Sequence, residues 1–84
     1  MDAIQAEVHG YVLREFLPGE DPGELTVETP LISGGVLDSI GTLKLVGYLE
    51  AHFGIVLEPH EADVDHLDSL RAIARLVGRK LAAA

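Results

Sequence analysis

Apolar residues recur every three or four positions near the start of the chain, which is the repeat of an amphipathic helix. They are Ile4, Val8, Tyr11, Val12 and Phe16. The repeat stops at the segment LPGEDPG, residues 17–23, where two prolines and two glycines disfavour a helix. The spacing therefore predicts a first helix over residues 2–16.

A second helical repeat follows residue 38. Asp38 or Ser39 is a suitable N-cap, and Gly54 is suited to end the helix just after Phe53. At 100° per residue, one arc gathers the residues expected to face the core: Leu45, Val46, Leu49 and Phe53. The opposite arc carries Ile40, Lys44, Gly47 and Ala51. An exposed isoleucine beside small residues suggests a contact surface, although single exposed apolar residues are also common.

The last repeat lies near the end of the sequence, where Asp68 or Ser69 can cap a helix. Its apolar positions are Leu70, Ile73, Ala74, Val77 and Leu81. Arg79 and Lys80 lie near the C-terminal end of this helix, where positive charge is favourable. Before it, the segment LEPHEADVDH, residues 57–66, leaves room for at most one or two short helical turns after Pro59.

Residues 17–37 are predicted to be a long loop, pinned by Leu25, Val27, Leu31 and Ile32. A loop of this length is uncommon in a small domain unless it has a function. Apolar residues make up 48% of the chain but aromatic residues only 5%, so aliphatic side chains must form the core. We expect a single all-α domain over residues 1–84: a four-helix bundle with three main helices, one short helix and a long loop between the first two.

Composition excludes several classes of function. The chain has no cysteine, so it has neither disulfides nor a cysteine nucleophile, and its net charge of −8 argues against a nucleic-acid partner. No apolar run approaches the roughly 18 residues of a membrane span, and the N-terminus lacks the features of a signal peptide. We therefore expect a cytoplasmic protein that does not insert into membranes.

Acidic and histidine residues crowd one short segment, which raises the question of a metal site. They are His60, Glu61, Asp63, Asp65, His66 and Asp68. Their spacing matches neither a His-Glu-x-x-His pair nor a calcium loop, so we expect a solvated connector and no metal. A Ser-His-Asp hydrolase would also need an oxyanion hole and a substrate pocket, for which so short a chain has little room. We expect no catalytic residues.

The tripeptide Leu-Asp-Ser occurs twice, at residues 37–39 and 67–69. Local composition explains both copies as helix caps. Ser39 differs from Ser69 because a long loop and the pair Gly34-Gly35 precede it, and because the helix that follows carries little charge.

The run GGVLDSIGTLKLVGYLEAHFGIVL, with the loop before it and LDSLRAIARLV after it, resembles the acyl and peptidyl carrier proteins over nearly the whole chain. In that family an Asp-Ser-Leu motif opens the second helix of a four-helix bundle, and its serine carries 4′-phosphopantetheine. Asp38, Ser39 and Ile40 occupy those places here. The helix pattern of the family is also present, in Leu45, Leu49, Glu50, Phe53 and Gly54.

The resemblance implies a carrier that holds an acyl or aminoacyl group as a thioester on a 4′-phosphopantetheine arm at Ser39, which coenzyme A supplies. Asp38 would help a phosphopantetheinyl transferase to engage the serine. The other implied partners are an adenylating ligase or acyltransferase that loads the arm and a downstream enzyme that accepts the acyl group. Partners are expected to contact Val36, Leu37, Ile40, Leu43, Lys44 and Gly47. We expect the carrier to act as a monomer.

The second helix lacks the row of acidic residues that is usual in carriers of fatty-acid synthesis. It has Gly41, Lys44 and Gly47 instead, and its only acid, Glu50, lies near its end. The sequence at the start of this helix, LDSIGTLKLV, is more similar to D-alanyl carrier proteins and to stand-alone carriers of aminoacyl or polyketide pathways. Secondary metabolism is therefore the expected setting. The alternatives are a carrier for fatty-acid synthesis and a small helical interaction module without a prosthetic group.

Overall fold

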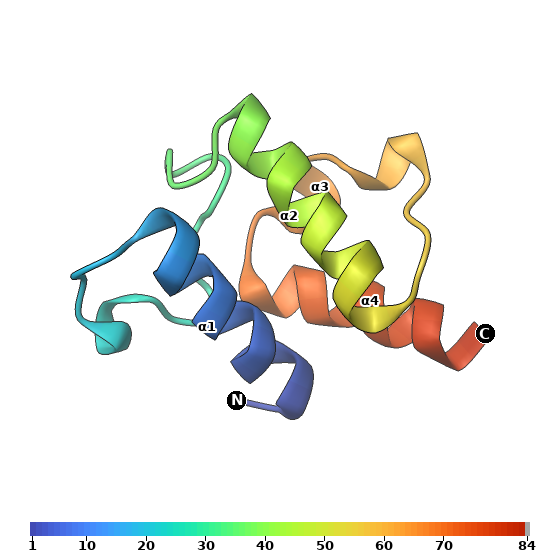
Figure 1. Cartoon of the computed structure of the whole chain (residues 1–84), viewed down its shortest axis with the longest axis horizontal. Coiled ribbons are helices and arrows are strands. Elements are labelled where there is room, and N and C mark those ends of the chain that lie inside the picture. Colours follow the sequence, from blue (N-terminus) through green and yellow to red (C-terminus); the bar gives the residue numbers. More distant parts are fainter. Residues whose placement is uncertain (84) are drawn as a thin grey trace.

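Three long helices and one short helix make up the computed structural model, which describes residues 1–83 (Figure 1). The helices are α1 (Ala3–Phe16), α2 (Ser39–Phe53), α3 (Val64–Leu67) and α4 (Leu70–Ala83). Two single 3₁₀ turns lie in the connections, η1 (Pro22–Glu24) and η2 (Pro59–Glu61). This arrangement confirms the predicted all-α bundle with a long loop between α1 and α2.

The N-terminal end of α1 is fixed by a capping box. Asp2 Oδ1 accepts a hydrogen bond from the Gln5 N–H at 2.7 Å, and Gln5 Oε1 accepts one from the Asp2 N–H at 3.0 Å. The buried face of α1 consists of Val8, Tyr11 and Val12, while the other two members of the predicted repeat, Ile4 and Phe16, are partly buried. The helix stops at Phe16, just before Leu17 and Pro18.

Helix α2 ends where the sequence indicated. Gly54 adopts a left-handed conformation with φ +66°, and its N–H donates to Glu50 O at 3.0 Å. A residue with a side chain is strained at such a φ, so glycine is well suited to this position. Leu45 and Leu49 are completely buried, while Val46 and Phe53 are partly buried at the edge of the core. The predicted core stripe is thus narrower than expected.

Helix α4 packs against α1, α2 and α3 and so forms the centre of the bundle. Its buried residues are Leu70, Ile73, Ala74, Leu76 and Val77. The predicted stripe omitted Leu76 and wrongly included Leu81, which is 42% exposed. In Figure 1 the C-terminal end of α4 extends beyond α2.

Aromatic side chains join α1 to α2. The rings of Tyr11 and Tyr48 stack with centroids 3.9 Å apart, and Tyr48 stacks in turn on His52 at 5.1 Å. The Tyr11 hydroxyl donates to Lys44 O at 3.2 Å. Burial raises the pKa of both tyrosines above its ordinary value.

The long loop is anchored by four apolar residues, as predicted. Leu25 and Leu31 are buried, and Val27 and Ile32 pack against the same core. The Val27 carbonyl also accepts a hydrogen bond from the N–H of Arg71 in α4, at 3.1 Å. The loop therefore belongs to the packed structure even though it has little helix of its own.

Candidate functional site

The first Asp-Ser pair lies at the start of α2, and the aspartate is the cap. Asp38 has an extended backbone, and its Oδ1 accepts a hydrogen bond from the Gly41 N–H at 2.6 Å. Ser39 is the first residue of the helix and is exposed. Its hydroxyl has no hydrogen-bond partner among residues 1–83. The Ser39 hydroxyl is therefore accessible from solvent.

In the second Asp-Ser pair the serine, and not the aspartate, caps the helix. Ser69 Oγ accepts a hydrogen bond from the Ala72 N–H at 3.1 Å, so the serine caps α4. Asp68 instead accepts hydrogen bonds from the long loop, at Ile32 and Ser33. The two identical tripeptides are thus distinct in structure, and only the first leaves a serine hydroxyl available.

The position of Ser39 suits an attached anion. The first N–H groups of a helix have no partner within the helix, and the helix dipole places partial positive charge there. Asp38 uses the Gly41 N–H, while the backbone N–H groups of Ser39 and Ile40 precede the first bond within the helix. A phosphate joined to Ser39 Oγ would meet these groups, so the residues present fit a phosphate-linked prosthetic group.

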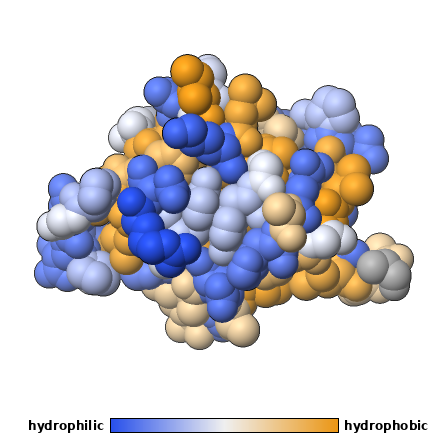
Figure 2. Space-filling view, in the orientation of Figure 1, coloured by the Kyte–Doolittle hydropathy of each residue, from blue (hydrophilic) through white to orange (hydrophobic). Residues whose placement is uncertain are grey.

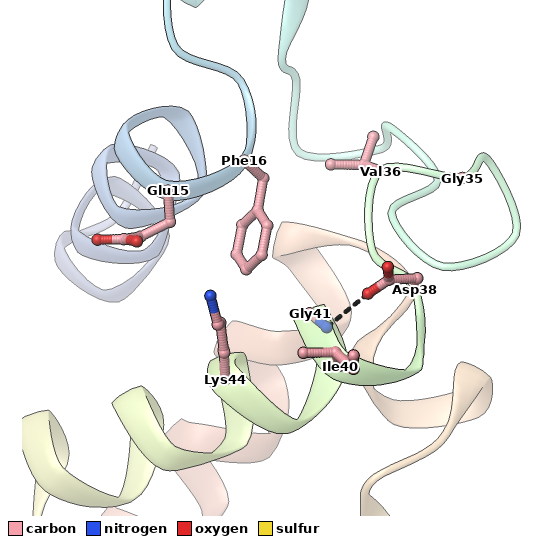
Figure 3. A pocket seen from close by; sticks show the side chains of 8 residues that line it. All are labelled: Glu15, Phe16, Gly35, Val36, Asp38, Ile40, Gly41 and Lys44. Atoms are coloured by element: carbon pink, nitrogen blue, oxygen red, sulfur yellow. Dashed lines mark hydrogen bonds between the residues drawn. The ribbon is translucent and has the colours of Figure 1, made fainter.

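Figure 3 shows a hollow on one side of this turn, between the end of α1 and the start of α2. Its volume is about 290 Å³. The side chains of Phe16 and Lys44 point into it, and Gly41 lies beneath the Phe16 ring. A Cβ atom on Gly41 would lie 3.1 Å from Phe16 Cε1 and 3.2 Å from Asp38 Oδ1. The turn that presents Ser39 is therefore built around a buried glycine.

A larger open groove of about 520 Å³ lies on the other side of Ser39, between α2 and the start of α3. Leu43 and Thr42 line it from α2, and Ala62, Asp63 and Val64 line it from the opposite wall. Asp63 caps α3 by accepting from the His66 N–H at 3.1 Å. Its Oδ1 also lies 2.7 Å from His66 Nδ1, and this hydrogen bond lowers the pKa of Asp63.

The residues predicted to contact partners differ in exposure. Ile40 is 67% and Leu43 is 69% exposed, and Lys44 and Gly47 are exposed as well. Figure 2 shows hydrophobic residues at the top of the molecule, over the start of α2. Val36 is partly buried, and Leu37 is only 2% exposed and packs in the core. Leu37 therefore supports this surface from below.

Sequence reasoning missed two residues of the site. The helical repeat did not show that Gly41 faces the interior, because the ring that covers it comes from α1. The sequence indicated only a helix cap or a metal ligand at Asp68, whereas its carboxylate binds the loop before Ser39. No local pattern in the sequence indicated this contact, because Ile32 and Ser33 are 36 and 35 residues away.

Residues 1–83 contain no group of three or more His, Asp or Glu side chains placed so as to hold a metal ion. No helix within those residues combines the length and the apolar character needed to cross a membrane.

The chain matches a protein-family model. The family model described as a phosphopantetheine attachment site covers residues 13–77, which include the end of α1, the long loop, α2, α3 and the first half of α4. No curated protein matches the chain. The matched residues include both Asp-Ser pairs.

Proposed function

The chain belongs to the family of carrier proteins with a phosphopantetheine attachment site, and on that premise we propose that Ser39 bears the group. The family is not catalytic, and its prosthetic group is 4′-phosphopantetheine. One observation carries the assignment to Ser39. Because Asp38 caps α2, the Ser39 hydroxyl is exposed and unpaired within residues 1–83, whereas Ser69 is engaged in capping α4.

The chain and its prosthetic group divide the chemistry between them. The 4′-phosphopantetheine supplies the thiol, which the chain lacks because it has no cysteine, and the thiol carries the acyl group as a thioester. On the transferase, Ser39 Oγ would attack the phosphorus that bears the pantetheine of coenzyme A. The Oγ–P bond would form as the pyrophosphate P–O bond breaks, adenosine 3′,5′-bisphosphate would leave, and the hydroxyl proton would pass to a base of the transferase. The first turn of α2 would then hold the phosphate next to unpaired N–H groups. Asp38 keeps this turn in place through its hydrogen bond to the Gly41 N–H.

Carriers of this family interact with a phosphopantetheinyl transferase and with enzymes that load and accept the acyl group. In this chain, the partner contact face is proposed to consist of Ile40, Leu43, Lys44 and Gly47, with Val36 at its edge. Its two largest apolar side chains are more than half exposed. Apolar contact near the reactive serine is therefore proposed to contribute more to recognition than charge does.

The cargo is proposed to be an aminoacyl or short acyl group, in a pathway of secondary metabolism. The charge on α2 supports this proposal, since Glu50 is the only acid in that helix. The Oε2 atom of Glu50 accepts a hydrogen bond from the Leu57 N–H at 3.0 Å, so this carboxylate stabilises the segment that follows α2. This leaves no row of acids on α2 for the basic patches that enzymes of fatty-acid synthesis present. The loading enzyme would then be an adenylating ligase or an acyltransferase.

Intact-mass measurement tests the attachment site. Incubation with coenzyme A and a promiscuous phosphopantetheinyl transferase should add one phosphopantetheine to the wild-type protein. Ser39→Ala should abolish the addition, and the matched variant Ser69→Ala should retain it. Modification mapped to any residue other than Ser39 would refute the assignment, and no modification at all would favour the interaction module without a prosthetic group.

A further inference from the structure

Asp68 connects two parts of the molecule that are far apart in the sequence. It follows α3 and precedes α4, yet its carboxylate binds the long loop. Oδ1 accepts hydrogen bonds from the N–H of Ile32 at 2.7 Å and of Ser33 at 2.8 Å. Oδ2 accepts one from the Ser33 hydroxyl at 2.7 Å, and the Asp68 carbonyl accepts one from the Leu31 N–H at 2.7 Å. One residue thus satisfies four donors on three consecutive residues.

The bound segment leads directly to the reactive serine. Leu31 is completely buried, and its carbonyl accepts a hydrogen bond from the Leu37 N–H at 2.8 Å, which closes residues 31–37 into a loop. The turn within this 31–37 loop is tight, because a Cβ atom on Gly34 would lie 2.3 Å from Pro30 O. Leu37 is followed by Asp38, the cap of α2, and then by Ser39. Asp68 therefore fixes residues 31–33 at the start of the loop. The hydrogen bond between Leu31 and Leu37 connects that end to the residue just before the cap of α2.

We propose that Asp68 is a positioning residue for the loading of Ser39. It holds the 31–37 loop in the form that the phosphopantetheinyl transferase binds together with the first turn of α2. This inference rests on the proposed function. A transferase that binds an ordered loop need not order it during binding, so loss of the carboxylate should weaken binding more than it slows the chemical step.

The chemistry of the carboxylate supports this role. Hydrogen bonds from the backbone and hydroxyl of Ser33 lower the pKa of Asp68, so the group is ionised at neutral pH and its hydrogen bonds are charge-assisted. Asparagine is nearly the same shape. Its oxygen can accept from both N–H groups, and its amide can donate to the Ser33 hydroxyl in a reversed hydrogen bond. Asp68→Asn therefore preserves the geometry and removes only the charge.

The test measures kcat and KM of the transferase for the carrier as substrate. Asp68→Ala should raise KM and lower kcat/KM by about tenfold, with little change in kcat. Asp68→Asn should remain within about threefold of wild type because the geometry is kept. Ser33→Ala removes only the contact to Oδ2 from an exposed residue, so it should fold normally and raise KM by about two- to threefold.

Ser69→Ala is the matched control. It removes a cap hydrogen bond from the neighbouring residue and destabilises α4 without touching the 31–37 loop. It should load with wild-type KM at temperatures where the protein is folded. Hydrogen exchange gives a second readout, because the amides of Ile32 and Leu37 should exchange faster in Asp68→Ala than in Ser69→Ala.

The outcomes are distinguishable. An unchanged KM in Asp68→Ala, or an equal rise in KM in Ser69→Ala, would overturn the positioning role and leave the proposed function intact. A wild-type protein that is not modified at Ser39 would overturn the proposed function itself, and the positioning role with it. That result is read from the wild type before any variant is compared.

Discussion

Replacing Gly41 by alanine tests whether the turn under Ser39 depends on close packing. Gly47 provides the matched control, because it lies in the same helix, is exposed, and has no heavy atom within 4 Å of an added Cβ. In a helix alanine is favoured over glycine by about 1 kcal/mol. Gly47→Ala should therefore raise the free energy of unfolding by about that amount.

Gly41→Ala should instead lower the free energy of unfolding. The new Cβ would lie 3.1 Å from Phe16 Cε1 and 3.2 Å from Asp38 Oδ1, closer than the roughly 3.5–4.0 Å of ordinary contact. Tyr11 packs edge-on against the Phe16 ring at 5.8 Å and limits how far it can move. Overpacking of this kind costs about 1–3 kcal/mol, so the net change should be a loss of about 1 kcal/mol. The two variants should then differ by about 2 kcal/mol.

Urea unfolding followed by circular dichroism at 222 nm measures this difference. With a slope of about 1–1.5 kcal/mol per molar urea for so small a protein, the midpoints should differ by more than about 1 M. The Phe16→Leu substitution removes the ring. In that background Gly41→Ala should no longer lower the free energy of unfolding and should recover most of the stabilisation that alanine gives a helix. Equal stabilisation by Gly41→Ala and Gly47→Ala in the wild-type background would refute the packing argument.

Four further outcomes are expected. Asp38→Ala should lower the free energy of unfolding by about 1 kcal/mol through loss of the cap and should slow loading of the serine, and equal loading rates of variant and wild type would contradict its role. Ile40→Ala should weaken acyl transfer to a partner and Gly47→Glu should weaken it further, whereas affinity that falls steeply with salt and ignores both changes would indicate an electrostatic interface. The lowered pKa of Asp68 means that its contribution to stability is present above about pH 4 and is lost as pH falls through the lowered value. In acid titrations the wild type should therefore lose stability relative to Asp68→Asn. NMR spectra of the apo, holo and loaded forms should change along the groove beside Ser39 and not at Leu49, because a polar cargo in the core would leave polar atoms unpaired at a cost of about 1–3 kcal/mol each. Large shifts at Leu49 would show that the cargo enters the core.

The ends of the long helices were predictable because their signals are local. The repeat of α1 stops at the prolines, and Gly54 ends α2 in a left-handed conformation. Burial along α4 was less predictable. Leu81 keeps the helical spacing of the buried residues and is nevertheless 42% exposed, because the repeat within α4 does not record where packing against the other helices ends.

The division of roles between the two Asp-Ser pairs could not be read from the sequence. Asp and Ser are both good caps, so local preference left the choice open. In the second pair a distant contact decides it, because Asp68 is engaged with Ile32, 36 residues away, and Ser69 becomes the cap. In the first pair Asp38 is the cap, and this leaves Ser39 free.

The stack of Tyr11 on Tyr48 determines what optical spectroscopy of this protein can report. The chain has no tryptophan and only these two tyrosines, and both lie where α1 meets α2. The tyrosine bands in near-ultraviolet absorption and near-ultraviolet circular dichroism, and tyrosine fluorescence, therefore report on a single junction of the bundle. None of the residues that line the groove beside Ser39 is aromatic. These signals will follow the separation of α1 from α2 on unfolding, while events around the carried group require a probe placed on the arm itself.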